Sequence, residues 1–321
     1  MPEFTRSEAK DWGKANIADF YEAPITPITK DFEIDEDGFR ENIEAYLDMG
    51  VNGLVLGGFI AEGWNMGMDK WKRCHEIGAE MARGKTDLWT IVLDPIAEVV
   101  LEKLEFCEKL GYNGVELMNP MTQLRSDDEI YAFYKYVTDR SNMGIFLYRT
   151  PVSGTVLTSD CMKRLVDIDT VMGVKQGSLS RADSLTLRRT LRDDFIVSEP
   201  LEQFYLEDLR LGGQVLWAEL SYILYGKKRH LLKSYADLAR QGKWDEAFDK
   251  WAELRPAWII FEEHFLSSIA HNATYASAVG IVKTWCDALG LKTGPMLPPV
   301  VGQTPEEAEK LVARLQAAGI V

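Results

Sequence analysis

The sequence predicts an α/β protein, a (β/α)8 TIM barrel with a C-terminal three-helix extension. Short apolar runs alternate with amphipathic stretches eight times along the chain, which is the signature of repeated strand–helix units. Most residues of these runs are apolar, as in parallel strands that are buried on both faces. A doubly wound open sheet is the alternative, but it would need a phosphate-binding motif after its first strand. Residues 23–26 read Ala-Pro-Ile-Thr there.

Each apolar run marks a strand, and each amphipathic stretch marks the helix after it. The predicted strands cover residues 17–23, 53–56, 88–93, 114–118, 144–148, 170–175, 195–198 and 214–218. The predicted helices cover residues 35–49, 68–81, 95–110, 126–139, 158–166, 182–191, 201–211 and 223–239. Ser126 and Glu129 have capping-box spacing, and Thr158 or Ser159 caps the next helix.

The barrel, with a short N-terminal arm, is expected to occupy residues 1–240, and the extension residues 241–321. Three helices are predicted in the extension, at residues 244–265, 274–289 and 305–318. Residues 290–299 between the last two are rich in Gly and Pro, which favours a loop.

Composition excludes several classes of function. The chain of 321 residues is 46% hydrophobic and carries a net charge of −14, whereas nucleic-acid binding needs concentrated Lys and Arg. No uncharged apolar run approaches the ~20 residues that span a bilayer, and residues 1–14 lack the apolar core of a secretory signal. The four cysteines form no CxxC pair, which fits a reduced cytoplasmic protein. The four histidines form no HxH or HxxxH pair, so no metal site is expected.

Lys175 closes the sixth predicted strand. The stem of a lysine in this position lies in an apolar interior, and desolvation there favours the neutral amine. A neutral amine can attack a ketone to form a Schiff base. The alternative is a strand-end lysine that reaches water, since Lys is rarely buried without a partner.

In barrels of this kind the active site lies at the C-terminal ends of the strands. Tyr148 ends the strand before that of Lys175, so its hydroxyl could relay protons while the carbinolamine collapses to the imine. The alternative for Tyr148 is a core ring with a solvated hydroxyl. The other polar or aromatic residues at strand ends are Glu62, Asn119, Ser198, Glu199 and Trp217.

These residues lie in motifs that resemble a known family. Residues 146–151 read Phe-Leu-Tyr-Arg-Thr-Pro, and residues 173–178 read Gly-Val-Lys-Gln-Gly-Ser. Three further motifs are Ala-Pro-Ile-Thr-Pro at 23–27, Gly-Tyr-Asn-Gly-Val-Glu at 111–116 and Leu-Gly-Gly at 211–213. Together these motifs resemble the dihydrodipicolinate synthase / N-acetylneuraminate lyase family over nearly the whole chain. The resemblance implies a class I Schiff-base lyase with Lys175 as the imine-forming lysine and Tyr148 as the proton-handling tyrosine. It also implies no cofactor beyond the covalent imine, and a homotetramer built as a dimer of dimers.

The substrate motif departs from that family. Where the family usually has Gly-Thr-Thr-Gly-Glu, this chain has Gly58-Phe59-Ile60-Ala61-Glu62. The two hydroxyls that help to hold the carboxylate of a 2-oxo acid are absent, and Glu62 is retained. Losing two charge-assisted hydrogen bonds could cost roughly 1.5–3 kcal/mol each. Backbone amides of this loop could still bind a carboxylate.

Two further departures argue against the synthase activity. Pro120-Met121-Thr122 replaces the Pro-Tyr-Tyr whose second tyrosine completes the proton relay, and Thr122 is a poor substitute. Ser153 matches the arginine that binds the second substrate, so Arg149 nearby is the candidate to serve instead. Asn119, Thr122, Arg149 and Trp217 thus join Gly58, Phe59, Ile60 and Glu62 as predicted substrate-binding residues.

The expected substrate is a small carbonyl compound with a bulky apolar or aromatic part. Apolar and aromatic residues gather in the predicted strand ends and loops, namely Phe59, Ile60, Trp64, Met66, Trp71, Met118, Met121 and Trp217, and such pockets suit apolar ligands. A better-filled barrel mouth or a subunit contact would explain them equally well. By resemblance we favour a hydratase-aldolase acting on aromatic ylidene-pyruvates. The alternatives are a hydro-lyase acting on a sugar-derived 2-oxo acid, and a non-catalytic barrel used for binding or regulation.

Overall fold

Eight parallel strands form the predicted barrel in the computed structural model, which describes residues 2–121, 123–178, 180–272 and 275–321. The ladder runs in the order β7-β6-β5-β4-β3-β2-β1-β8. The strands are β1 (Asp19–Glu22), β2 (Gly53–Leu56), β3 (Asp87–Val92), β4 (Gly114–Met118), β5 (Gly144–Arg149), β6 (Val171–Gln176), β7 (Ile196–Ser198) and β8 (Val215–Glu219). Each lies within two residues of its predicted position at either end, because continuous apolar runs between turn residues are easily recognised.

A side chain bridges the last seam of the barrel, between β7 and β8. The Ser198 hydroxyl donates to the Val215 carbonyl oxygen at 2.9 Å and accepts from the Trp217 amide at 3.0 Å. Ser198 is fully buried, so these bonds satisfy backbone groups that would otherwise be unpaired in the interior. The hydroxyl therefore takes the place of a ladder hydrogen bond where β7 ends.

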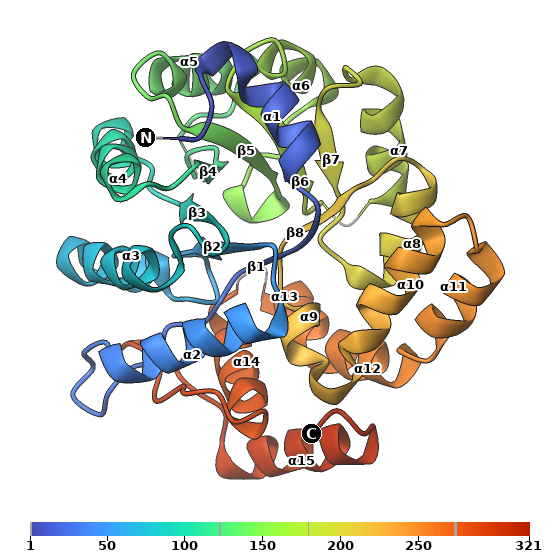
Figure 1. The fold of residues 1–321 in the computed structure, drawn as a ribbon. Helices are drawn as coiled ribbons and strands as arrows, with labels where there is room; N and C mark the ends of the chain where they lie inside the picture. Colours follow the sequence, from blue (N-terminus) through green and yellow to red (C-terminus); the bar gives the residue numbers. More distant parts are fainter. Residues whose placement is uncertain (1, 122, 179, 273–274) are drawn as a thin grey trace.

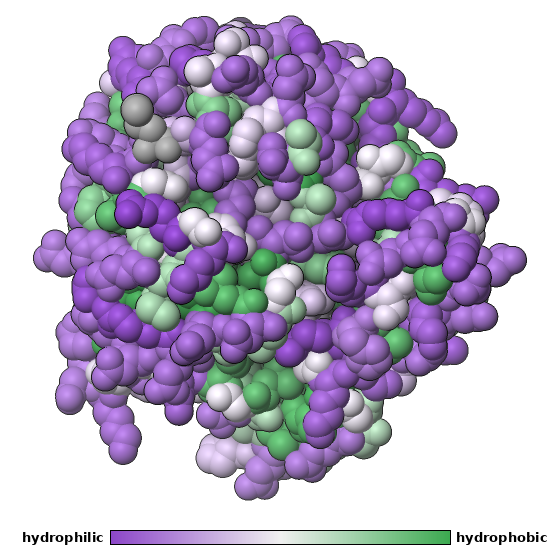
Figure 2. Space-filling view, viewed as in Figure 1, coloured by the Kyte–Doolittle hydropathy of each residue, from purple (hydrophilic) through white to green (hydrophobic). Residues whose placement is uncertain are grey.

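Helices surround the strands (Figure 1). Around the barrel they are α1 (Ala9–Asn16), α2 (Glu36–Met49), α3 (Met68–Ala82), α4 (Ala97–Leu110), α5 (Asp127–Thr138), α6 (Ser159–Leu165), α7 (Arg181–Thr190), α8 (Tyr205–Arg210), α9 (Ser221–Leu224) and α10 (His230–Arg240). Hydrophilic residues cover most of the viewed face, and hydrophobic ones show mainly in hollows between elements (Figure 2). This is the layering expected when each helix turns its apolar face toward the sheet.

Helix caps confirm two local predictions. The Ser126 side chain accepts from the Glu129 amide, and Glu129 reaches back to the Ser126 amide at 3.1 Å, which completes the capping box. Thr158, rather than Ser159, caps α6 through the Cys161 amide at 3.0 Å. The predicted helix at 223–239 is interrupted between α9 and α10, where Gly226 has a φ of 51°, a conformation that a continuous right-handed helix excludes.

The first predicted helix of the extension, residues 244–265, is several elements. They are α11 (Trp244–Ala252), α12 (Arg255–Ile260) and a π-helical segment η6 (Phe261–Leu266), and α13 (Ser267–Asn272) follows them. Pro256 sits in the first turn of α12, a position that proline tolerates, whereas a helix interior does not accept it. α14 (Ala276–Ala288) and α15 (Pro305–Ala317) follow, and the division of the chain at residue 240 stays a prediction.

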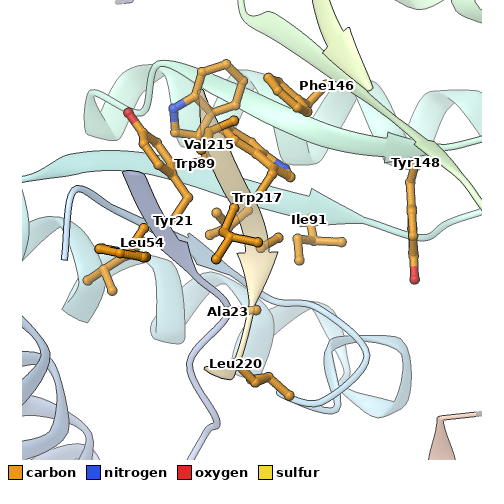
Figure 3. Close-up of a cluster of buried hydrophobic side chains, with 14 of the residues drawn as sticks. Tyr21, Ala23, Leu54, Trp89, Ile91, Phe146, Tyr148, Val215, Trp217 and Leu220 are labelled. Carbon is orange, nitrogen blue, oxygen red and sulfur yellow. The ribbon is translucent and has the colours of Figure 1, made fainter. Parts of the chain in front are cut away.

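Aromatic side chains fill the interior of the barrel (Figure 3). The Trp217 ring stacks on Phe146 with centroids 3.7 Å apart and meets the edge of Trp89 at 4.8 Å. Glycines make room for these rings, since a Cβ atom at Gly114 would lie 2.1 Å from Trp89, and one at Gly173 would lie 2.5 Å from Phe146. The packed rings leave open space only toward the ends of the strands.

Candidate functional site

A cavity of about 110 Å³ lies at the C-terminal ends of the strands, where the barrel meets the extension. A wider groove of about 660 Å³ between α14 and α15 is open to solvent and includes no residue of β4, β5 or β6. The smaller cavity is therefore the candidate site. From the barrel, the residues that matter for its chemistry are Gly58, Phe59, Ile60, Ile91, Glu116, Tyr148, Lys175, Ala218 and Glu219; from the extension, they are Phe261, Phe265, Leu266, Ile269 and Tyr275.

Lys175 reaches this cavity from β6 and is 9% exposed. Its Nζ donates to the carbonyl oxygen of Ala218 at 2.7 Å. The β1–β8 register shifts at this point, so Ala218 is the extra residue of a β-bulge, with a φ of 48°. Bulges of this kind redirect groups beside active sites. The lysine amine thus lies in a shielded position at the end of β6.

Tyr148 pairs with Lys175 in the β5–β6 ladder. The lysine Nζ lies 4.7 Å from the centre of the Tyr148 ring, and the two phenol oxygens of Tyr148 and Tyr275 are 2.6 Å apart. Burial raises the pKa of Tyr148 well above its ordinary value, and raises that of Tyr275 as well. Both hydroxyls are therefore protonated at neutral pH and can pass a proton between them. The sequence analysis missed Tyr275, because nothing in the sequence of the extension marks the residue before α14 as part of the site.

Three residues of the altered substrate loop line the cavity, as predicted for Gly58, Phe59 and Ile60. The Phe59 ring stacks on Tyr275, with centroids 4.7 Å apart and planes 18° apart. Within the part of the chain that the structure describes, the amides of Phe59 and Ile60 donate no hydrogen bond to protein atoms. Of the eight apolar residues singled out from sequence, only Phe59 and Ile60 line this cavity.

Glu116, in the middle of β4, is a further site residue that the sequence analysis missed. It is fully buried and lines the cavity. One carboxylate oxygen, Oε2, accepts from Trp217 Nε1 at 2.9 Å, and the other, Oε1, lies 3.7 Å from Lys175 Nζ. Burial raises the pKa of Glu116, while Lys175 and Trp217 act in the opposite direction. A charged residue inside the apolar run 114–118 was the signal that could have found it.

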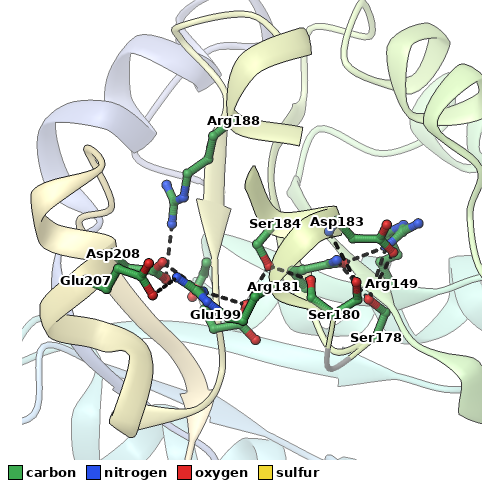
Figure 4. A network of polar contacts seen from close by, with 12 residues as sticks. Arg149, Ser178, Ser180, Arg181, Asp183, Ser184, Arg188, Glu199, Glu207 and Asp208 are labelled. Carbon is green, nitrogen blue, oxygen red and sulfur yellow. Dashed lines mark hydrogen bonds and ion pairs between the residues drawn. The ribbon is translucent and has the colours of Figure 1, made fainter. Parts of the chain in front are cut away.

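Arg149 does not reach the cavity, contrary to the prediction. It follows Tyr148 on β5, and successive side chains on a strand point to opposite faces. Its guanidinium donates to Asp183 at 2.9 Å (Figure 4). It also donates to Gln176 at 3.0 Å and to the Leu157 carbonyl oxygen at 2.7 Å. The Arg149 guanidinium therefore links β5 to groups outside the barrel interior rather than to the cavity.

Asn119 and Trp217 also lie outside the cavity lining. Asn119 is fully buried and donates to the Thr155 carbonyl oxygen at 3.1 Å. The Trp217 ring is part of the aromatic packing inside the barrel and contacts the site only by donating to Glu116. Both were predicted from their places at strand ends; Asn119 instead bonds to the backbone at Thr155, and Trp217 packs among the interior rings. Thr122 lies outside the described residues.

Glu62 was predicted to bind substrate, and its two carboxylate oxygens are already occupied by protein groups. One accepts from Lys283 Nζ at 2.8 Å, and the other from the Leu297 amide at 2.7 Å. Glu62 is 1% exposed and has a left-handed φ of 60°. The residue therefore joins the loop after β2 to the C-terminal extension and is absent from the cavity lining.

Comparison with known proteins places the chain among barrel lyases. A family model described as the dihydrodipicolinate synthetase family matches residues 16–318. The chain belongs to this family. A 4-hydroxy-tetrahydrodipicolinate synthase of Moorella thermoacetica is 25% identical over 93% of this chain and 97% of its own length. A synthase of the same name from Methanosarcina acetivorans is 24% identical over the same shares.

Solved structures show the same fold. The 4-hydroxy-tetrahydrodipicolinate synthase of Methylacidiphilum fumariolicum superposes with a TM-score of 0.82 at 20% identity, covering 94% of this chain and 96% of the other. The CdNal protein of Clostridium difficile, solved with mannosamine, has a TM-score of 0.78 at 18% identity, with 94% and 97% covered.

Membership in the dihydrodipicolinate synthetase family confirms the predicted enzyme class, a carbon–carbon lyase of the class I aldolase type. It leaves the substrate open. In the described parts of the chain, no helix is long and apolar enough to cross a membrane. No group of three or more His, Cys, Asp or Glu side chains in those parts could hold a metal ion.

Proposed function

We propose that this family member is a Schiff-base lyase that forms or breaks a C–C bond next to the carbonyl of a 2-oxo acid with a bulky apolar or aromatic part. One observation carries the proposal: the Lys175 amine is shielded at the end of β6, beside the Tyr148 phenol and inside an apolar cavity. Lys175 is the nucleophile, and Tyr148 with Tyr275 transfers protons.

The carboxylate of the substrate can be held without the two threonines. Phe59 and Ile60 line the same cavity as Lys175, and their amides have no protein acceptor in the described structure. Consecutive backbone N–H groups of this kind form anion sites. This arrangement supports binding of the 2-oxo acid end of the substrate beside the lysine.

The remainder of the cavity favours an apolar substrate part. Four apolar side chains of the extension line it together with Phe59 and Ile60, namely Phe261, Phe265, Leu266 and Ile269. Among the described lining residues Lys175 is the sole cation, so a second carboxylate would lack a charged partner. A sugar chain would need several hydrogen-bonding groups, which this wall does not provide. The apolar wall therefore favours the aldolase over a hydro-lyase acting on a sugar-derived 2-oxo acid.

The reaction follows from these positions. The neutral Lys175 amine attacks the keto carbon, and the resulting carbinolamine loses water to give an iminium ion. The iminium withdraws electrons from the bond between the third and fourth carbons, which breaks to release an aldehyde and leave an enamine. The hydroxyl on the fourth carbon gives up its proton as that bond breaks, and Tyr148 with Tyr275 can relay this proton to the third carbon of the enamine, so both phenols end unchanged.

Benzylidenepyruvate tests this proposal. After hydration, cleavage should release benzaldehyde and pyruvate in equal amounts, measured by chromatography. Lys175→Met should abolish both products, and Lys310→Met, a substitution on the exposed face of α15, should leave the rate unchanged. Turnover by the Lys175→Met protein, or no cleavage by the wild-type protein, would contradict the proposal.

By the same family resemblance we infer a homotetramer. A monomeric dihydrodipicolinate synthase variant is among the solved structures with this fold, at 20% identity and a TM-score of 0.82, so family membership alone does not fix the assembly. The cytoplasmic location likewise stays a prediction from the cysteine pattern.

A further inference from the structure

Glu116 is a buried carboxylate with only one of its oxygens hydrogen-bonded. Oε2 accepts from the Trp217 indole, and Oε1 has no hydrogen-bond partner in the described structure. An incompletely partnered buried carboxylate is costly, whereas a neutral amide could satisfy the same indole N–H. The carboxyl group is therefore not explained by the packing around Trp217.

The free oxygen points to the reacting amine. It lies 3.7 Å from Lys175 Nζ, slightly beyond a hydrogen bond, and Glu116 lines the cavity with the lysine. The ionisable groups that act on it come from three elements: Lys175 of β6, Tyr148 of β5 and Tyr275 of the extension. Lys175 is the one basic side chain among these three groups, and it lies within ion-pair distance of the free oxygen.

Other buried glutamates near the site show what a structural role looks like. Glu219 also lines the cavity, but it accepts from the backbone amides of Ser221 and Tyr222 at the start of α9. Glu202 is fully buried, and its two oxygens accept from Tyr235 and from the Trp258 indole, each at 2.6 Å. Glu116 differs from both because its second oxygen is directed at the lysine.

On the basis of the proposed Schiff-base activity, we propose that Glu116 is a catalytic acid–base residue that takes the ammonium proton of Lys175 and delivers it to the oxygen that leaves as water. Trp217, by donating to Oε2, is a positioning residue for this carboxylate. The free oxygen of Glu116 and the short distance to Nζ are the observations that carry this inference.

The proton balance closes without a co-reactant. The Lys175 ammonium loses a proton to the Glu116 carboxylate, which gives a neutral amine and a carboxylic acid. The amine attacks the carbonyl carbon, and one N–H proton passes to the former carbonyl oxygen. The carboxylic acid then protonates that hydroxyl, the C–O bond breaks, water leaves, and the nitrogen lone pair forms the C=N bond. The products are an iminium ion and a Glu116 carboxylate, which serves as its counter-ion.

Glu116→Gln tests the inference, since glutamine keeps the shape and can still accept from Trp217. The readout is the rate at which borohydride traps the pyruvate adduct, measured from roughly pH 5 to pH 10, with circular dichroism to check the fold. In the wild type the rate should be bell-shaped, because the pair must hold one shared proton. In Glu116→Gln it should fall by about 100-fold near neutral pH, and the decline at high pH should disappear because no carboxylic acid is left to lose its proton.

Glu202→Gln is the matched control, because Glu202 is equally buried and also accepts from an indole. It should keep the bell-shaped profile. A Glu116→Gln protein with the wild-type rate and profile, or one with a uniformly lower rate but an unchanged profile, would overturn the role of Glu116. Failure of the wild-type protein to form any adduct would instead contradict the Schiff-base activity, so the two failures are distinguishable.

Discussion

Lys175 and Tyr148 meet because β5 and β6 are paired in register, with both side chains on the inner face of the barrel. The same alternation turns their chain neighbours outward. Arg149 and Gln176 are also register partners, and they bond to each other on the outer side. Only every second residue of these strands therefore directs its side chain toward the inside of the barrel, where the cavity lies.

The two phenols should be distinguishable by substitution. Tyr148→Phe removes the hydroxyl and keeps the ring that lies against the Lys175 amine, so we expect kcat for benzylidenepyruvate cleavage to fall by about 100-fold. Tyr275→Phe leaves the Tyr148 hydroxyl in place without its 2.6 Å partner and should cost less, about 10-fold. Steady-state kinetics would measure both. Unchanged kcat in Tyr148→Phe would exclude the phenol from proton transfer.

Sequence reasoning located the lysine and the tyrosine because each closes an apolar run, and the end of such a run is easy to recognise. It did not show that Arg149, Asn119, Glu62 and Trp217 lie outside the cavity lining, because a position at or after a strand end does not say what a side chain contacts. It overlooked Glu116 because attention was on strand ends rather than strand interiors. Because side chains alternate along a strand, Arg149, the residue after Tyr148, would have been expected on the outer side of the barrel.

At the scale of elements, the loop after β2 and the C-terminal extension build the site together. Phe59 of the loop stacks on Tyr275 of the extension, and Glu62 of the same loop pairs with Lys283 of α14. Both partners of the ion pair are nearly fully buried, and burial lowers the pKa of Lys283 while Glu62 opposes that shift. The pair fixes the extension where Tyr275 can meet Tyr148.

Lys283→Met should leave the Glu62 carboxylate buried with only the Leu297 amide as partner. Breaking a buried pair in this way costs about 3–5 kcal/mol, which urea unfolding should show as a lower free energy of unfolding. The double variant Glu62→Gln/Lys283→Met should recover part of that loss, because it removes the unpaired charge. Lys310→Met, at an exposed i,i+4 pair with Glu306, should change stability by less than about 1 kcal/mol. A Lys283→Met protein as stable as this control would contradict the structural role.

The breaks in the extension illustrate the limits of pattern reading at this scale. The amphipathic pattern over 244–265 indicated one helix, and Pro256 at the start of α12 divides it. The π-helical segment η6 has no comparable signal in the sequence, yet its Phe261 and Phe265 line the cavity. The apolar lining that the extension contributes to the cavity thus depends on tertiary packing, which helix propensities along the sequence do not predict.

At the scale of the whole molecule, stacked aromatic rings fill the barrel interior, and the cavity lies at one end of it under the C-terminal extension. The fold class follows from the sequence because eight apolar runs with intervening amphipathic stretches admit few other arrangements. The chemistry is concentrated where three regions converge: β4 to β6 with Glu116, Tyr148 and Lys175, the altered loop after β2, and Tyr275.

The account depends on an imine at Lys175. The most direct measurement is borohydride reduction of the wild-type protein in the presence of pyruvate, and separately of benzylidenepyruvate, followed by peptide mapping by mass spectrometry. We predict one covalent adduct per chain, located on Lys175, and none in Lys175→Met. An adduct on another lysine, or no adduct with either compound, would contradict the account.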